Sequence, residues 1–357
     1  MSSSKLQAVI DCDVHYRWQS IEQIAPYVKE PWRSRLLRGA SVYPNNTYFN
    51  VAGIRRRDAV PPDGGSPGSD PHFLIADLVD AYSMDYIILN GEAGHLGVSN
   101  LPNSDWASTL ASAYNDWLIN DWLTIDQRFL GSIIVATQDP QQAAREIDRI
   151  AGHPQLVQVL LGAGARFPYG QRHYYPIYEA AERNGLPIAI HPGTEGPGIS
   201  NPPTAVGYPS YYIEWHTCLT TAFQAHLVSL ICEGVFERFQ ELRFVFLEGG
   251  VSWLPPLLWR LDKNYKGLRS EVPWLKKCPS AYAEEHLMLS TQPIEEPPQS
   301  HQLNQILEMF PAEKMLMYSS DYPHWDFDDP RAIFRHFSSG FRGRVFSENA
   351  RQFYGLK

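Results

Sequence analysis

The feature that most constrains the fold of this 357-residue chain is a repeated alternation of short apolar runs with amphipathic segments. The apolar runs have the length of buried strands, whereas segments such as 105–126 and 139–152 place apolar residues three and four positions apart, as helices do. Strands and helices in this alternation predict parallel strands joined by right-handed crossovers. The predicted strands cover residues 8–10, 85–90, 131–137, 156–161, 186–191, 242–248, 286–290 and 314–321.

Eight such strands favour an α/β protein with a closed (β/α)₈ barrel, in one domain over residues 1–357. An open, doubly wound sheet is the alternative, but no G-x-G-x-x-G motif follows the first strand. Residues 55–71 are rich in Pro, Gly, Ser and Asp, so we expect an inserted loop or lid after the first strand, over about residues 40–72. Residues 344–356 are expected to form a helix that packs across the outside of the barrel.

Charge and cysteine content restrict the partners. The formal net charge of −9 argues against nucleic acid and against an anionic membrane surface, because both require basic patches. Four scattered cysteines without a C-x-x-C pair suggest neither a zinc knuckle nor a disulfide framework. The amino-terminal residues contain no apolar leader, and no apolar stretch is long enough to span a membrane. We therefore expect a cytoplasmic protein that acts on a small molecule.

Potential metal ligands stand at the ends of three predicted strands. Asp13 and His15 follow the first strand, His191 ends the fifth and Asp321 follows the eighth. In barrels of this type the functional side chains gather where the strands end. Two carboxylates and two imidazoles suit one divalent transition-metal ion, for which we expect Zn²⁺, with Mn²⁺ as the alternative.

The first of these strand ends reads V-I-D-C-D-V-H, residues 9–15. Alternation along a strand predicts that Asp11, Asp13 and His15 share one face while Ile10 and the other apolar residues share the opposite face. Asp11 lies deeper on that face, so we expect it to hydrogen-bond backbone or to orient a ligand instead of binding the ion.

Four segments resemble the amidohydrolase superfamily: the D-x-D-x-H run at 11–15, "IHPGTEG" at 190–196, residues 234–262 and "SSDYPHWD" at 319–326. Within it the chain is most similar to the branch of aminocarboxymuconate-semialdehyde decarboxylase and γ-resorcylate decarboxylase. The resemblance runs from about residue 8 to the C-terminus and is weakest in the inserted loop. It implies a distorted TIM barrel of the metal-dependent hydrolase type, one divalent ion and a homodimer.

The resemblance matches the branch's first-strand ligand pair, H-x-H or E-x-H, to Asp13 and His15, and its other two ligands to His191 and Asp321. The chain departs from the branch after strand six. The decarboxylases have a histidine there that handles the proton, whereas this chain has Glu248, followed by two glycines.

A carboxylate at this position suits a general base for water. We therefore expect a hydrolase that cleaves a C–C, ester or amide bond next to a carbonyl of a small, aromatic or carboxylated substrate. The alternative is a non-oxidative, metal-dependent decarboxylase of an aromatic or muconate-type acid. A barrel that serves as a non-catalytic scaffold is the third hypothesis, which four converging ligands disfavour.

Three residues are candidates for proton transfer: Asp321, Glu248 and His216, which stands near the start of a helical stretch. Glu248 could instead form an ion pair with an arginine of the core such as Arg260. His226, ten residues further along that stretch, is expected to be a packed helix histidine.

Three further residues are candidates for substrate binding: Trp253, His324 and Arg55. Each has a purely structural alternative. Trp253 could belong to the core, His324 could cap the loop after strand eight, and Arg55 could be part of a solvated Arg-Arg-Arg run.

Overall fold

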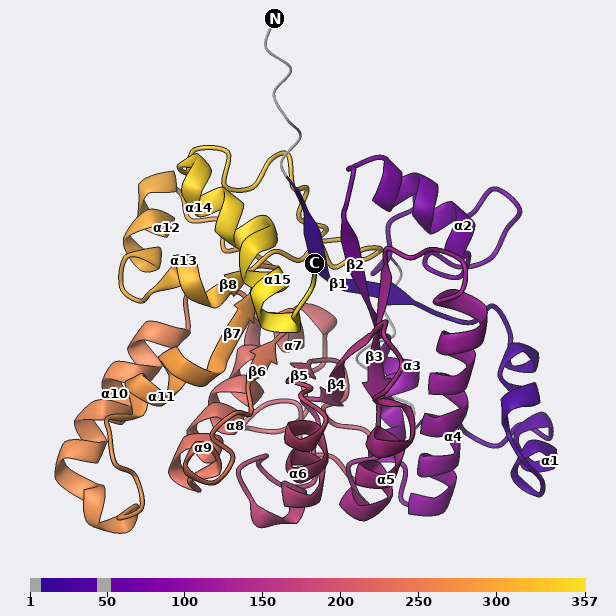
Figure 1. The fold of residues 1–357 in the computed structure, drawn as a ribbon, viewed down its shortest axis with the longest axis horizontal. Helices are drawn as coiled ribbons and strands as arrows, with labels where there is room; N and C mark the ends of the chain where they lie inside the picture. Colours follow the sequence, from indigo (N-terminus) through magenta and orange to yellow (C-terminus); the bar gives the residue numbers. More distant parts are fainter. Residues whose placement is uncertain (1–7, 44–52) are drawn as a thin grey trace, which may run out of the picture.

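In the computed structural model, which describes residues 8–43 and 53–357, eight parallel strands form one sheet in chain order (Figure 1). The sheet closes on itself, because Cys12 N donates to Tyr318 O (3.0 Å) and His15 N to Tyr322 O (2.7 Å), which joins the first strand to the last. This closure confirms the expected (β/α)₈ barrel. The strands are β1 Ile10–Tyr16, β2 Tyr86–Gly91, β3 Phe129–Ile134, β4 Leu156–Gly162, β5 Ile188–His191, β6 Phe244–Phe246, β7 Leu287–Ser290 and β8 Leu316–Met317.

Helices follow the strands, as the amphipathic segments predict. The segment at 105–126 becomes a helix that continues into a π-helical turn, and the segment at 139–152 becomes a single helix. The α-helices are α1 Trp32–Leu37, α2 Pro71–Leu74, α3 Ala93–Leu96, α4 Ser104–Trp117, α5 Pro140–Ile150, α6 Tyr175–Arg183, α7 Tyr212–Cys218, α8 Thr220–Cys232, α9 Val235–Arg238, α10 Leu254–Leu268, α11 Pro279–His286, α12 Ser300–Leu307, α13 Ala312–Met315, α14 Ser339–Gly343 and α15 Asn349–Tyr354. Among the described residues, none of these helices is long and apolar enough to cross a membrane.

Short 3₁₀ and π segments complete the described chain. They include a π-helical turn, η9, that leads directly into α15. The segments are η1 Ile21–Gln23, η2 Ala25–Tyr27, η4 Ile75–Asp80, η5 Gly97–Asn100, η6 Leu118–Trp122, η7 Arg172–Tyr174, η8 Arg269–Glu271 and η9 Arg344–Glu348.

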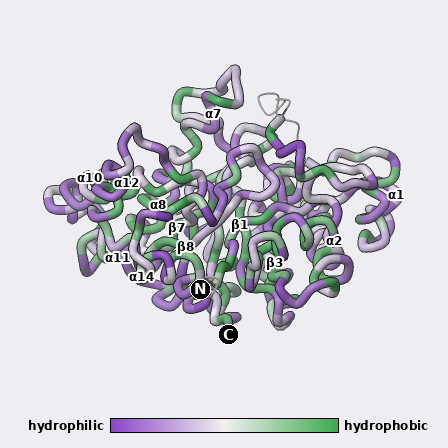
Figure 2. The backbone as a smooth tube through the Cα atoms, turned by 90° about the horizontal axis from the view of Figure 1, so that it is seen from above, coloured by the Kyte–Doolittle hydropathy of each residue, from purple (hydrophilic) through white to green (hydrophobic). Residues whose placement is uncertain are grey.

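The strands bury both of their faces. Their outward apolar side chains form a large core with the surrounding helices, and their inward side chains fill the barrel. Figure 2 shows hydrophobic stretches in the interior near β1 and β3, while outer segments such as α10 mix hydrophobic and hydrophilic residues. The buried residues that line the barrel's interior are Ile10, Cys12, Ile88, Leu130, Leu160, Ala189, Val245, Leu247, Met288 and Met317.

The C-terminal helix lies elsewhere than the sequence suggests. Instead of packing across the outside, α15 places Ala350 and Phe353 in the same apolar cluster as the inward side chains of the strands. Arg243, which precedes β6, donates a hydrogen bond to Phe353 O at 2.8 Å. The helix therefore closes the end of the barrel where the strands begin, because the apolar interior would otherwise be open to water there.

The inserted loop after the first strand has no regular element over residues 53–70, as its composition predicts. An isolated antiparallel bridge between Arg55 and His324 holds it against the loop that follows β8. The part of the prediction that falls on residues 44–52 lies outside the described residues. A role as a lid stays a prediction.

Replacing Phe353 by Ala should destabilise the protein by about 3–5 kcal/mol, because it removes a ring that is only 4% exposed and leaves a cavity in the floor of the barrel. Chemical denaturation of the purified variant measures this change. Trp259→Ala is the matched control, since Trp259 is an aromatic residue that is 55% exposed, and we expect a change within about 0.5 kcal/mol. Equal stability of the two variants would contradict the role of α15 as a floor.

Candidate metal centre

Five ionisable side chains meet at the end of the barrel where the strands finish. Asp13 and His15 come from β1, His191 ends β5, Glu248 follows β6 and Asp321 follows β8. All five are buried, and one potential ligand atom from each lies within 4.8 Å of the others. The structure thus brings together all four predicted metal ligands and adds Glu248 to them.

A β-bulge in β1 sets the direction of the first two candidate ligands, Asp13 and His15. The pairing of β1 with β2 shifts between Asp11 and Val14, so the strict alternation expected from the sequence is wrong here. Cys12 lies inside the barrel whereas Val14 packs outside it. Asp11 turns away from the cluster, where its Oδ1 accepts hydrogen bonds from the amides of Asp13 (3.2 Å) and Ser320 (2.9 Å). Such backbone bonding is the alternative that the sequence favours for Asp11.

The two histidines face each other across the cluster, with ring centroids 4.9 Å apart. His191 Nδ1 lies 2.8 Å from the carbonyl oxygen of Pro192, so Nδ1 donates to that oxygen and Nε2 is the nitrogen that faces the cluster. A backbone carbonyl behind a histidine in this way is the usual support of a metal-binding imidazole.

The donor atoms fit a divalent cation. Asp13 Oδ2, His15 Nε2 and His191 Nε2 are buried, and their polar neighbours are members of the cluster itself: His15 Nε2 lies 2.9 Å from Asp321 Oδ1, and His191 Nε2 lies 3.4 Å from Asp13 Oδ2. Burying polar atoms whose hydrogen bonds are incomplete costs free energy, and so does placing the carboxylates of Asp13, Glu248 and Asp321 close together. A divalent cation among them would offset both costs, and nitrogen and oxygen donors are what such ions prefer.

Burial and neighbouring charges shift the pKa values of two carboxyls of the cluster in opposite directions. Burial raises the pKa of Asp321 well above its usual range, and the nearby charges of Glu248, Asp326 and Asp13 raise it further. Burial acts in the same direction on Asp13, but His191 and His15 outweigh it and lower the pKa of Asp13 to about 2. Of these two carboxyls, Asp321 therefore holds a proton more readily than Asp13.

Two members of the cluster have strained backbone. Glu248 has φ 54° and Asp321 has φ 59°, in the left-handed region that residues with a side chain avoid. Such a conformation costs on the order of 1–3 kcal/mol and persists only where the surrounding structure enforces it. Glu248 lies two residues after β6 and Asp321 four residues after β8, and at both positions the strained backbone turns the carboxylate into the mouth of the barrel.

Next to the cluster, His216 of α7 faces Glu248. His216 Nε2 lies 3.8 Å from Glu248 Oε1 and 3.3 Å from Asp326 Oδ2. Burial lowers the pKa of His216, but the contact with Asp326 and the charge of Glu248 outweigh it and raise that pKa. Glu248 itself lies 3.1 Å from His191, so it is an ionic partner of two histidines and not of Arg260. His226 behaves as expected of a packed helix histidine, with Nε2 2.9 Å from Ala163 O.

A cavity of about 560 Å³ opens beside His216 and Asp326. It is large enough for a single-ring compound, and its walls combine aromatic rings with carboxylates. The lining residues are His216, Thr217, Leu219, Thr220, Gly249, Gly250, Ser252, Trp253, Pro293, Ile294, Glu295, Glu296, Trp325, Asp326, Phe327 and Asp328.

The three candidate substrate-binding residues have different surroundings. His324 Nδ1 lies 2.8 Å from Asp321 Oδ1, so this histidine reaches the cluster. Trp253 lines the cavity but also stacks on Phe246, with ring centroids 6.1 Å apart, so it serves wall and core together. The guanidinium of Arg55 forms two hydrogen bonds with the buried Glu92, at 3.0 and 2.6 Å, which leaves it less free to clamp a substrate.

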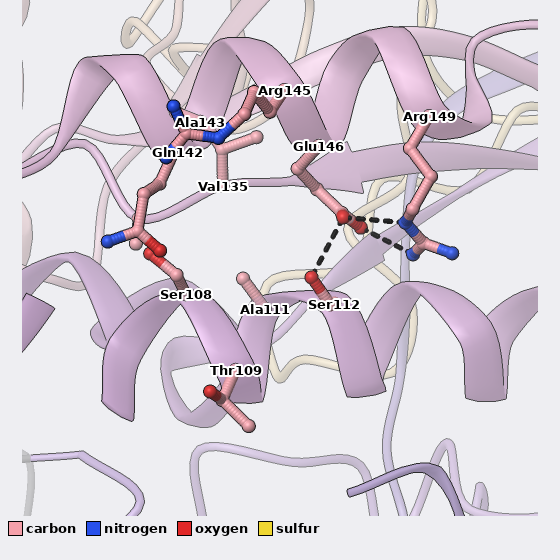
Figure 3. A pocket seen from close by; sticks show the side chains of 11 residues that line it. Ser108, Thr109, Ala111, Ser112, Val135, Gln142, Ala143, Arg145, Glu146 and Arg149 are labelled. Atoms are coloured by element: carbon pink, nitrogen blue, oxygen red, sulfur yellow. Dashed lines mark hydrogen bonds and ion pairs between the residues drawn. The ribbon is translucent and has the colours of Figure 1, made fainter. Parts of the chain in front are cut away.

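A second cavity, of about 260 Å³, lies between α4 and α5 on the outer surface of the barrel (Figure 3). Glu146 lines it, and the Glu146 carboxylate accepts hydrogen bonds from Ser112 and Arg149. Because Ser112 and Arg149 already bond it, the Glu146 carboxylate is not free to bind a ligand.

Sequence reasoning missed two residues of the site. Asp326 pairs with His216, and its signal is its place in the "SSDYPHWD" run, which also contains Asp321 and His324. Asn90 donates to Asp13 Oδ1 at 2.8 Å, and the polar end of the apolar run at 85–90 was its only signal.

Comparison with known proteins places the chain in a family. The family model described as amidohydrolase matches residues 10–356. Among curated proteins, the γ-resorcylate decarboxylase of a Polaromonas species is 23% identical over 299 residues, which are 78% of this chain and 86% of that protein. The γ-resorcylate decarboxylase of Rhodococcus jostii is 27% identical over 199 residues, 52% of this chain and 57% of that protein.

Solved structures show the same fold. The 5-carboxyvanillate decarboxylase of Novosphingobium aromaticivorans, crystallised with manganese and 4-hydroxy-3-methoxy-5-nitrobenzoic acid, superposes with a TM-score of 0.73 at 22% identity, over 100% of this chain and 98% of that one. The 2,6-dihydroxybenzoate decarboxylase of Rhizobium gives a TM-score of 0.68 at 18% identity, over 98% and 99% of the two chains. With a family model that spans nearly its whole length, this chain belongs to the amidohydrolase family.

Proposed function

We propose that this protein is a metal-dependent decarboxylase of an aromatic carboxylic acid. The observation that supports it most is the cluster of five buried ligand side chains at the mouth of an amidohydrolase barrel. The curated relatives and solved structures named above are decarboxylases of hydroxylated benzoates. They favour decarboxylation, the second of the two activities expected from the sequence, over hydrolysis.

In this proposal Asp13, His15, His191 and Asp321 hold one divalent ion, and Glu248 is close enough to be a fifth ligand. The ion supplies positive charge that attracts the substrate's carboxylate and stabilises negative charge as it develops. Three carboxylates beside two imidazoles make the site rich in oxygen, which brings Mn²⁺ level with the Zn²⁺ expected from the sequence. Structures of two decarboxylases with this fold contain manganese.

The residues beside the ligands supply the proton. Decarboxylation leaves a carbanion at the ring, so an acid has to deliver a proton to that carbon. Glu248 lies among the candidate ligands, and His216 lies 3.8 Å from it, at the wall of the cavity. We assign proton delivery to Glu248, which would take the proton from the neighbouring imidazolium of His216 and pass it to the ring carbon as CO₂ leaves; Asp326 would hold His216 in place, and Asp321 would have a supporting role.

Hydrolysis is the second candidate, and Glu248 is the observation that favours it. A buried carboxylate that contacts two histidines is also suited to take a proton from water. The two reactions differ in their products, so one assay separates them.

We further propose that the aromatic ring occupies the 560 Å³ cavity, with Trp253 as one wall and His324 near the reacting group. Arg55 would contribute to substrate binding indirectly, through its ion pair with Glu92. A homodimer, a cytoplasmic location and a single domain over residues 1–357 stay predictions from the sequence.

One divalent ion per chain should bind and stabilise the protein. At a free Mn²⁺ concentration one hundred times the Kd, the stabilisation should be about 2.7 kcal/mol, because the ion binds the folded state alone. Thermal unfolding of chelator-treated protein with and without Mn²⁺ or Zn²⁺ measures it. His191→Ala should abolish the shift, whereas His226→Ala, which removes another buried histidine, should keep it. A wild-type protein that gains no stability from either ion would refute the metal centre.

Glu248→Gln should lower kcat by about 100-fold or more, because the amide can neither deliver nor accept the proton. The assay follows CO₂ release from 2,6-dihydroxybenzoate and 5-carboxyvanillate, and ¹⁸O from labelled water in the products of ester and amide substrates. Incorporation of ¹⁸O without CO₂ release would establish hydrolysis instead.

Glu146→Gln is the control for that substitution, since Glu146 is a buried carboxylate remote from the cluster, and its kcat should equal that of the wild type. The metal content of Glu248→Gln distinguishes two roles. Retention of the ion with loss of turnover assigns proton transfer to Glu248, whereas loss of the ion makes Glu248 a ligand.

A further inference from the structure

The interior of the barrel contains a layer of polar side chains directly beneath the metal centre. Asn90 of β2, Ser132 of β3 and Gln158 of β4 point inward and are at most 1% exposed. They interrupt an interior that is otherwise apolar. Since buried polar side chains are costly unless they are fully paired, their arrangement calls for a physical explanation.

The three side chains form a closed hydrogen-bonded ring. Ser132 Oγ donates to Asn90 Oδ1 at 2.5 Å, and Gln158 Nε2 donates to both Asn90 Oδ1 (3.1 Å) and Ser132 Oγ (2.9 Å). Asn90 Oδ1 thus accepts two hydrogen bonds, so the amide cannot be turned over without placing donor against donor. Its Nδ2 has to face the other way.

That nitrogen is directed at the metal centre. Asn90 Nδ2 donates to Asp13 Oδ1 at 2.8 Å and to Cys12 O at 3.1 Å, which uses both of its protons. The bond to Asp13 Oδ1 leaves Oδ2 of the same carboxylate on the side of His191, 3.4 Å from Nε2. Asn90 therefore orients the Asp13 carboxylate within the cluster, with Oδ2 towards His191 and Oδ1 3.6 Å from His15 Nε2.

The ring is held from the opposite end of the barrel by the C-terminal helix. The hydroxyl of Tyr354, in α15, donates to Gln158 Oε1 at 2.8 Å. Because this bond occupies the oxygen of the Gln158 amide, the nitrogen is turned towards Asn90 and Ser132. The hydrogen bonds from Tyr354 to Gln158, from Gln158 to Asn90 and from Asn90 to Asp13 therefore run from the floor of the barrel to its mouth.

We propose that Asn90 is a positioning residue for the metal ligand Asp13, and that Ser132, Gln158 and the hydroxyl of Tyr354 set the direction of its amide. Through them the helix that closes the floor of the barrel contributes to metal affinity at the opposite end. This inference rests on the metal centre proposed above. It assigns these residues no contact with substrate.

Isothermal titration calorimetry of the metal-free protein with Mn²⁺ measures the Kd and so tests the proposal without any assay of activity. Asn90→Leu has nearly the same volume but no donor, and it should raise the Kd for Mn²⁺ about 10–100-fold, as loss of a group that orients a ligand does. Tyr354→Phe removes a single hydroxyl at the partly exposed end of the series. It should raise the Kd by about threefold or more, since it acts through two intervening side chains.

Two matched variants separate positioning from general destabilisation. Asn115→Leu removes a buried asparagine that bonds Ile134 and Glu146 outside the barrel, and Tyr178→Phe removes a buried hydroxyl that donates to Tyr169 O. Both should lower the melting temperature of the metal-free protein and leave the Kd for Mn²⁺ unchanged.

Each outcome decides the proposal. A raised Kd in Asn90→Leu and Tyr354→Phe, with an unchanged Kd in the two controls, supports it. If Tyr354→Phe has a Kd within about twofold of the wild type, the link to α15 is overturned. Tyr354→Phe also decides the proposal if Asn90→Leu fails to fold. An unchanged Kd in a folded Asn90→Leu overturns the positioning role while the proposed function stands. A wild-type protein that binds no Mn²⁺ and no Zn²⁺ overturns both.

Discussion

Mutual compensation between carboxylates and imidazoles at the mouth of the barrel is the constraint on which the site depends. Asp13, Glu248 and Asp321 would repel one another strongly at this depth if nothing positive lay among them. His191 offsets part of this charge through contacts of 3.4 Å with Asp13 and 3.1 Å with Glu248. A divalent cation would complete the compensation, and the backbone strain at Glu248 and Asp321 shows that the fold enforces the arrangement.

The barrel meets the opposite requirement at its other end. There the interior is apolar, and α15 seals it with Ala350 and Phe353. Between the apolar floor and the charged mouth lies the hydrogen-bonded layer of Asn90, Ser132 and Gln158. Such a layer is stable only when every donor and acceptor is paired, and a fully paired layer has a single orientation. Full pairing makes the layer stable in the interior, and it also lets Asn90 orient Asp13.

Much of the fold could be predicted because its signals are local. All eight predicted strands occur, although the last shrinks from 314–321 to Leu316–Met317 and the first extends to Tyr16. Strand boundaries depend on pairing with neighbours, which sequence periodicity does not record. The outward position expected for α15 was wrong for a related reason: an amphipathic helix has one apolar face whether it packs against the side of a barrel or over its open end.

For the site, the chain's own residues identified the ligand types and the strand ends that bear them. Chemistry alone determined this much, because imidazoles and carboxylates after strands of one parallel barrel have to meet at the same end. Only the tertiary structure decided that a bulge turns Asp11 away while Asp13 and His15 enter, that Glu248 stands within reach of the ligands, and that Asp326 and Asn90 support them. Those facts depend on distances between segments remote in the chain, which are set by packing and hydrogen bonding across strands and are not encoded in any local pattern.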